Sequence, residues 1–81
     1  MLIDVVKVKA LDNYMILLTF ENGETRIFDV KSYLELGNFK KIRNKEMFDT
    51  VRVVLGTVEW SNGVDIDPEV LYEDSIAIVE P

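Results

Sequence analysis

Three carboxylates lie within five residues of the chain, at Asp65, Asp67 and Glu69. Carboxylates at alternate positions can ligate a calcium ion, and a pair of them can serve as acid and base in glycoside hydrolysis. However, Pro68 interrupts the calcium-loop pattern, and so small a domain has little room for a sugar-binding cleft. Helix capping by Asp67, with Pro68 and Glu69 in the first turn, accounts for the same residues without an ion. Metal binding by this cluster therefore stays an alternative to helix capping.

Most other catalytic chemistry is excluded by residue types that the chain lacks. The 81 residues include no His and no Cys, which rules out Ser-His-Asp and Cys-His arrangements, disulfides and thiolate zinc sites. The 4 glycines are dispersed and do not form a phosphate-binding loop. The sequence therefore predicts no catalytic residue, no cofactor and no enzyme activity.

The charges are unevenly distributed along the chain, whose formal net charge is −6. All 9 Lys and Arg residues lie before residue 53, whereas residues 53–81 hold seven of the 15 acids and no cation. An acidic surface of this kind attracts a basic protein partner. Four of these acids have no evident capping role and are predicted partner contacts: Glu59, Glu73, Asp74 and Glu80.

A basic stretch is formed by Lys40, Lys41, Arg43 and Lys45. These side chains could contact phosphate or an acidic partner surface, or simply form a solvated connection. Tight nucleic-acid binding needs several cations on one face and an element that enters a groove. Neither the net charge nor the short predicted helices support it, so we expect contact with a protein and not with nucleic acid.

The first half of the chain predicts three antiparallel strands, over residues 2–10, 14–20 and 25–28. Asn22-Gly23 accepts positive φ at both positions and is the strongest short-range signal for a hairpin. In the second strand, Tyr14, Ile16, Leu18 and Phe20 share one face, and Met15, Leu17 and Thr19 share the other. Because both faces are apolar, we expect a central strand, or one whose second face is covered by a helix or a partner.

The second half predicts two short helices and further strands. Asp29 is placed to cap a helix over residues 30–36, and Gly37 ends it; residues 38–49 are expected to form a loop with a helical turn. Strands follow at 51–55 and 57–60, with Trp60 and Phe20 as core aromatics, then an Asn-Gly turn at Gly63 leads to a helix over 68–74. Residues 75–79 are a short strand or a tail. The sequence thus predicts a single α+β domain over 1–81, with an antiparallel sheet of about five strands and two short helices in the order βββ-α-ββ-α.

The N-terminal segment is interrupted by Asp4 and Lys7, so it does not resemble a signal peptide. No apolar run reaches the roughly 18 residues that span a bilayer. We therefore expect a cytoplasmic protein that does not enter a membrane. A chain of this size buries only about 60–65% of its unfolded surface, and a homodimer is one way to bury more.

An ordered set of motifs covers nearly the whole chain. It runs through Leu18, Phe20, Asn22, Gly23, Phe28 and Asp29, then Tyr33, Leu34, Gly37, Phe39 and Phe48, then Val58, Trp60, Gly63, Asp65, Ile66, Pro68, Glu69, Leu71 and Tyr72. This pattern resembles a bacterial family known as Domain of Unknown Function 2442. The resemblance implies a small α+β domain, similar to the N-terminal domain of proteins that add a helix-turn-helix. It also implies no established catalytic residues and an antitoxin-type role beside a small toxin-like protein.

Taken together, the residues and the resemblance predict a non-catalytic protein-interaction module, antitoxin-like or regulatory, that binds a small basic protein. The alternative is a regulatory domain that binds a small ligand or a metal ion through Asp65, Asp67 and Glu69. No helix-turn-helix is predicted within residues 1–81, which argues against direct operator binding.

Overall fold

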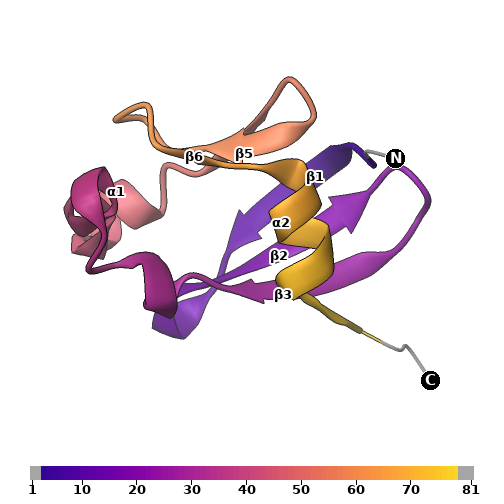
Figure 1. Cartoon of the computed structure of the whole chain (residues 1–81), viewed down its shortest axis with the longest axis horizontal. Helices are drawn as coiled ribbons and strands as arrows, with labels where there is room; N and C mark the ends of the chain where they lie inside the picture. Colours follow the sequence, from indigo (N-terminus) through magenta and orange to yellow (C-terminus); the bar gives the residue numbers. More distant parts are fainter. Residues whose placement is uncertain (1–2, 79–81) are drawn as a thin grey trace.

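The computed structural model describes residues 3–78, whose strands form two antiparallel sheets (Figure 1). Sheet A has the strand order β1-β2-β3-β7 and sheet B the order β4-β5-β6. The strands are β1 (Val5–Ala10), β2 (Met15–Phe20), β3 (Thr25–Asp29), β4 (Arg52–Val54), β5 (Thr57–Glu59), β6 (Asp65–Ile66) and β7 (Ile76–Ala77). The helices are α1 (Lys45–Phe48) and α2 (Pro68–Asp74), with 3₁₀ turns η1 (Asp12–Tyr14), η2 (Lys31–Tyr33) and η3 (Gly37–Arg43). The predicted α+β class is confirmed, although the strands divide into two sheets.

The hairpin between β2 and β3 forms at the predicted Asn-Gly turn. Gly23 has a φ of +89°, which a residue with a side chain rarely adopts. The Asn22 side-chain oxygen accepts a hydrogen bond from the Glu24 amide at 3.0 Å, and the register then pairs Thr19 with Thr25 and Met15 with Asp29. The turn therefore sets which side chains of β2 and β3 share a face.

The core lies between the inner face of sheet A, sheet B and the helices. Ile16, Leu18 and Phe20 of β2 are almost completely buried, as the alternation of β2 predicted. Figure 1 shows α2 crossing in front of β2 and β3, and its Leu71 is fully buried. Trp60 is also fully buried, and its indole N–H donates to the Phe48 carbonyl at 2.9 Å. Both predicted core aromatics, Phe20 and Trp60, are thus confirmed.

The middle of the chain is arranged differently from the prediction. The helix expected over residues 30–36 is only the 3₁₀ turn η2, with the Asp29 carboxylate accepting from the Lys31 amide at 2.9 Å. So short a segment cannot form a stable α-helix alone, and its conformation is set by docking: the Tyr33 ring packs against Phe28 and Phe39. Residues 37–48 are conversely more helical than predicted, because aromatic and aliphatic anchors hold η3 and α1 on the core.

The C-terminal elements match the prediction closely. α2 begins at Pro68 and ends at Asp74, and the Asp67 carboxylate caps it by accepting from the Glu69 amide at 2.8 Å. The chain then forms β7, which pairs with β3 at the edge of sheet A. Of the helices in residues 3–78, none has the length and hydropathy that crossing a bilayer requires.

Candidate interaction surface

The face of sheet A that points away from the core carries an apolar row across its strands. Residues that stand opposite one another in an antiparallel pair point to the same face. The register pairs Lys9 with Leu17, Leu17 with Ile27, and Ile27 with Ile76. Each strand of the sheet therefore contributes one residue to the row, and three of the four are apolar.

These outward side chains are incompletely covered. Met15, Leu17 and Ile27 are partly exposed, and none of them packs against the core cluster. Ile76 is 76% exposed and Ile78 is 36% exposed. We call Met15, Leu17, Ile27, Ile76 and Ile78 the outer patch; no element of residues 3–78 covers it. The predicted second apolar face of β2 is thus present and open.

The free charges beside the outer patch are positive. Lys7 and Lys9 are both on β1, and Lys7 stands opposite Thr19 of β2. Both lysines are exposed. Neither forms an ion pair with any residue in the described range 3–78. Asp29, which stands opposite Met15 on this face, lies 3.2 Å from the Lys31 ammonium. The outer patch is therefore bordered by two uncompensated cations along β1.

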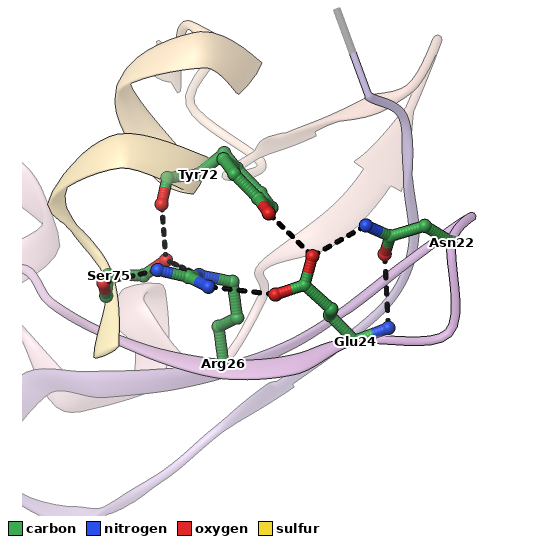
Figure 2. A network of polar contacts seen from close by, with 5 residues as sticks. All are labelled: Asn22, Glu24, Arg26, Tyr72 and Ser75. Carbon is green, nitrogen blue, oxygen red and sulfur yellow. Dashed lines mark hydrogen bonds and ion pairs between the residues drawn. The ribbon is translucent and has the colours of Figure 1, made fainter. Parts of the chain in front are cut away.

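A polar network holds β7 and α2 against sheet A (Figure 2). The Arg26 guanidinium donates to the Ser75 hydroxyl at 2.7 Å and to the Ser75 carbonyl at 2.8 Å. It also pairs with the Glu24 carboxylate at 2.9 Å and lies over the Tyr72 ring, 4.5 Å from its centroid. Because Ser75 directly precedes β7, these contacts fix the strand that supplies Ile76.

The Glu24 carboxylate is the acceptor at the centre of this network. The Tyr72 hydroxyl donates to it at 2.5 Å and the Asn22 side-chain amide at 2.6 Å. Hydrogen bonds from Tyr72 and Asn22, with Arg26 nearby, lower the pKa of Glu24, and the carboxylate in turn raises the pKa of Tyr72. These hydrogen bonds join the β2–β3 turn to α2 and so support the packing of α2 on sheet A.

The carboxylates of residues 65–69 have separate surroundings. Asp65 is an exposed residue of β6, whereas Asp67 and Glu69 begin α2, where Asp67 acts as the cap. Within the part of the chain that the structure describes, no three acidic side chains come together as metal ligands. The geometry thus supports helix capping and gives no support to the metal-binding alternative.

The predicted acidic partner contacts lie on two different elements, β5 and α2. Glu59 pairs with Arg52 at 3.0 Å, whereas Glu73 and Asp74 are exposed on α2 and form no ion pair within residues 3–78. Glu80 lies outside the described residues. A depression of about 260 Å³ beside α2 is lined by Ile3, Glu69, Tyr72 and Glu73.

The basic stretch lies on η3 and α1, away from α2 (Figure 1). Arg43 pairs with Glu35 at 3.4 Å, and Lys45 with Asp49 at 3.7 Å. Lys40 and Lys41 are exposed and have no ion pair among the described residues. Half of the stretch is therefore neutralised locally.

Three contributors to the outer patch, Ile27, Ile76 and Ile78, were not predicted as surface contacts. Because side chains alternate along a strand, Ile27 points to the other face of β3 from the core residue Phe28. That pattern could have identified Ile27 as a surface residue. Ile76 had no comparable signal, because its face depends on β7 pairing with β3, a contact between segments about fifty residues apart in the sequence.

Comparison with known proteins agrees with the motif pattern. No match is found among curated proteins or among solved structures. A family model described as "Protein of unknown function (DUF2442)" matches residues 5–77, nearly the whole of the chain. The match spans both sheets and α2, and on this evidence the chain belongs to the DUF2442 family.

Proposed function

We propose that this chain is a non-catalytic protein-interaction module that binds a partner protein through the outer patch. The observation that carries the proposal is the apolar row of Leu17, Ile27 and Ile76, which lies on the outer face of sheet A and does not pack against the core cluster. Apolar side chains gathered on one exposed face typically mark an interaction site. Burying them would add apolar contact that the chain itself does not supply.

The size and charge of the outer patch favour one kind of occupant. At about 3.4 Å per residue and 4.8 Å between strands, the six residues of β2, the five of β3 and the two of β7 offer a face of about 200 Å². A standard interface buries about 800 Å² on each partner, so a partner that docks here must also contact other surfaces of the chain. A single helix about 10 Å wide would cover the outer patch. Because Lys7 and Lys9 are free beside the patch, we propose an amphipathic helix of the partner, with acids along one flank.

A second contact is favoured by the acids at α2. Asp65, Asp67, Glu69, Glu73 and Asp74 are all exposed, and none forms an ion pair within residues 3–78. We propose that they contact a basic segment of a protein partner, whose side chains could enter the depression between Ile3 and Tyr72. α2 covers the inner face of sheet A, so this contact is separate from the outer patch. It supports the antitoxin-type role expected from the family resemblance.

The outer-patch proposal is tested by co-purification of the tagged full chain from its own cells. Ile76→Asp places a charge in the patch at a residue that is already 76% exposed, so folding should be unaffected. Leu36→Asp makes the same kind of change at another exposed apolar residue outside the patch. We expect a partner retained by the wild type and by Leu36→Asp to be lost with Ile76→Asp. Equal retention by all three proteins would refute the proposal.

The charge of each contact is tested by reversal. The pair Lys7→Glu and Lys9→Glu should weaken binding at the outer patch, whereas Glu69→Lys with Glu73→Lys should weaken binding of a basic partner. For the antitoxin-type role, the product of the neighbouring gene is co-expressed with each variant. Relief of its growth inhibition by the wild type but not by the α2 pair would support the role, and no relief by the wild type would refute it.

A further inference from the structure

The turn between β4 and β5 has an unusual residue at a demanding position. Val54 pairs with Thr57, so Leu55 and Gly56 alone connect the strands. Both have positive φ, +49° for Leu55 and +81° for Gly56. Two-residue turns of this kind favour Asn-Gly, because the left-handed conformation brings the Cβ atom of most residues close to the following carbonyl. Leucine at the first position is therefore a strained choice.

The side chain of Leu55 gains nothing inside the chain in return for this strain. It is 99% exposed, so it packs against no described residue. A polar Asn would remove an apolar side chain from water and tolerate the backbone conformation as well. Both the backbone and the side chain of Leu55 are thus unfavourable for the isolated protein.

The tip that carries Leu55 is held firmly. The Val5 amide donates to the Gly56 carbonyl at 2.8 Å, and the Asp4 carboxylate packs so closely that a Cβ atom at Gly56 would lie 2.6 Å from its oxygen. Across the hairpin, Arg52 pairs with Glu59 at 3.0 Å. A side chain on such a support loses little backbone freedom on binding.

We propose that the β4–β5 turn is a preorganised anchor that inserts Leu55 into an apolar pocket of a partner protein. The pocket is sized for one leucine side chain, and a cation at its rim would meet the Asp4 carboxylate beside Gly56. The inference rests on the turn geometry and on the exposure of Leu55, and it is independent of the outer patch.

The contact is mapped by a photo-reactive residue, p-benzoylphenylalanine, placed at position 55 of the full chain in its own cells. The same residue at position 36 replaces another exposed leucine, one with φ of −98°, and serves as the matched control. We expect a discrete adduct with another protein from position 55 and none from position 36. No adduct above the control, or an adduct only with a second copy of this chain, would overturn the proposal.

The partner that the adduct identifies is then purified by itself. Its affinity is measured for the wild-type chain and for three variants. Leu55→Asn should raise the midpoint of thermal unfolding of the free chain but weaken binding about ten- to a hundredfold, the loss expected from one buried leucine. Leu55→Met, of similar volume, should retain binding. Leu36→Asn should change neither property. A lower midpoint for Leu55→Asn, or unchanged affinity, would overturn the anchor, and neither result would bear on the outer patch.

Discussion

Replacing Ser75 with alanine tests how β7 is held on sheet A. Ser75 is 6% exposed, and its hydroxyl accepts from Arg26 at 2.7 Å and donates to the Tyr72 carbonyl at 3.0 Å. Ser75→Ala leaves the Nε donor of Arg26, whose side chain is only 15% exposed, without its acceptor. A lost hydrogen bond to a charged group costs about 1.5–3 kcal/mol, and we expect about 2 kcal/mol, because Arg26 keeps its bonds to the Ser75 carbonyl and to Glu24.

Such a loss is measurable in so small a protein. One kcal/mol shifts the thermal midpoint of a domain of 60–100 residues by about 4–8 °C, so Ser75→Ala should unfold about 8–16 °C below the wild type. The assay is thermal unfolding followed by circular dichroism, with Ser32→Ala, an exposed serine of η2, as the control. The control should stay within about 0.5 kcal/mol of the wild type.

A double-mutant cycle shows whether the effect travels through Arg26. The changes Ser75→Ala and Arg26→Met should be strongly non-additive, because each removes the same contact. Amide exchange at Ile78, whose N–H donates to the Thr25 carbonyl at 2.9 Å, should also accelerate in both variants. A Ser75→Ala protein as stable as the control, or additive losses, would refute the view that this contact holds β7.

Three further predictions concern the core, the polar network and α2. Trp60→Phe should destabilise the chain by about 2–3 kcal/mol in denaturant unfolding, because it leaves a cavity and an unpaired Phe48 carbonyl; a change below about 0.5 kcal/mol would contradict the buried position. Because the pKa of Glu24 is lowered in the folded state, its carboxylate contributes fully to the free energy of unfolding above the usual carboxyl pKa. This contribution is lost as the pH falls through the pKa of Glu24 in the folded chain. The thermal midpoint of Glu24→Gln should therefore lie below that of the wild type at pH 7 and converge with it as the pH falls below the usual carboxyl pKa, whereas a gap that does not narrow would refute the sign. Asp67→Ala should cost about 1 kcal/mol through loss of the α2 cap, measured by thermal unfolding.

Local signals in the sequence predicted the turns and helix starts well. Asn22-Gly23 fixed a hairpin, and Asp67-Pro68 fixed the start of α2, because turn and cap chemistry depends only on adjacent residues. The alternation in β2 also indicated that its second face is apolar. These features required no knowledge of distant contacts.

The rest depended on contacts between distant segments. Residues 30–48 follow the docking of Tyr33 and Phe39 and not helix propensity, and nothing local to Ile76 shows that β7 pairs with β3. The bonds from Arg26 to Ser75 join residues that are 49 positions apart. Likewise, the exposed position of Leu55 in a two-residue turn became evident only from the pairing of Val54 with Thr57. Long-range pairing therefore decided which residues form the candidate surfaces.

The central claim is that the outer patch is open in the free chain and covered by a partner. Isoleucine methyl signals report on it directly, because Ile27 and Ile76 lie on the patch while Ile16 and Ile42 are fully buried. With a soluble paramagnetic agent, the methyl of Ile76 should relax fastest in the free chain, and those of Ile16 and Ile42 should be protected. On addition of the protein that co-purifies with the chain, we predict that Ile27 and Ile76 become protected too. An Ile76 methyl that relaxes equally fast in the complex would contradict the account.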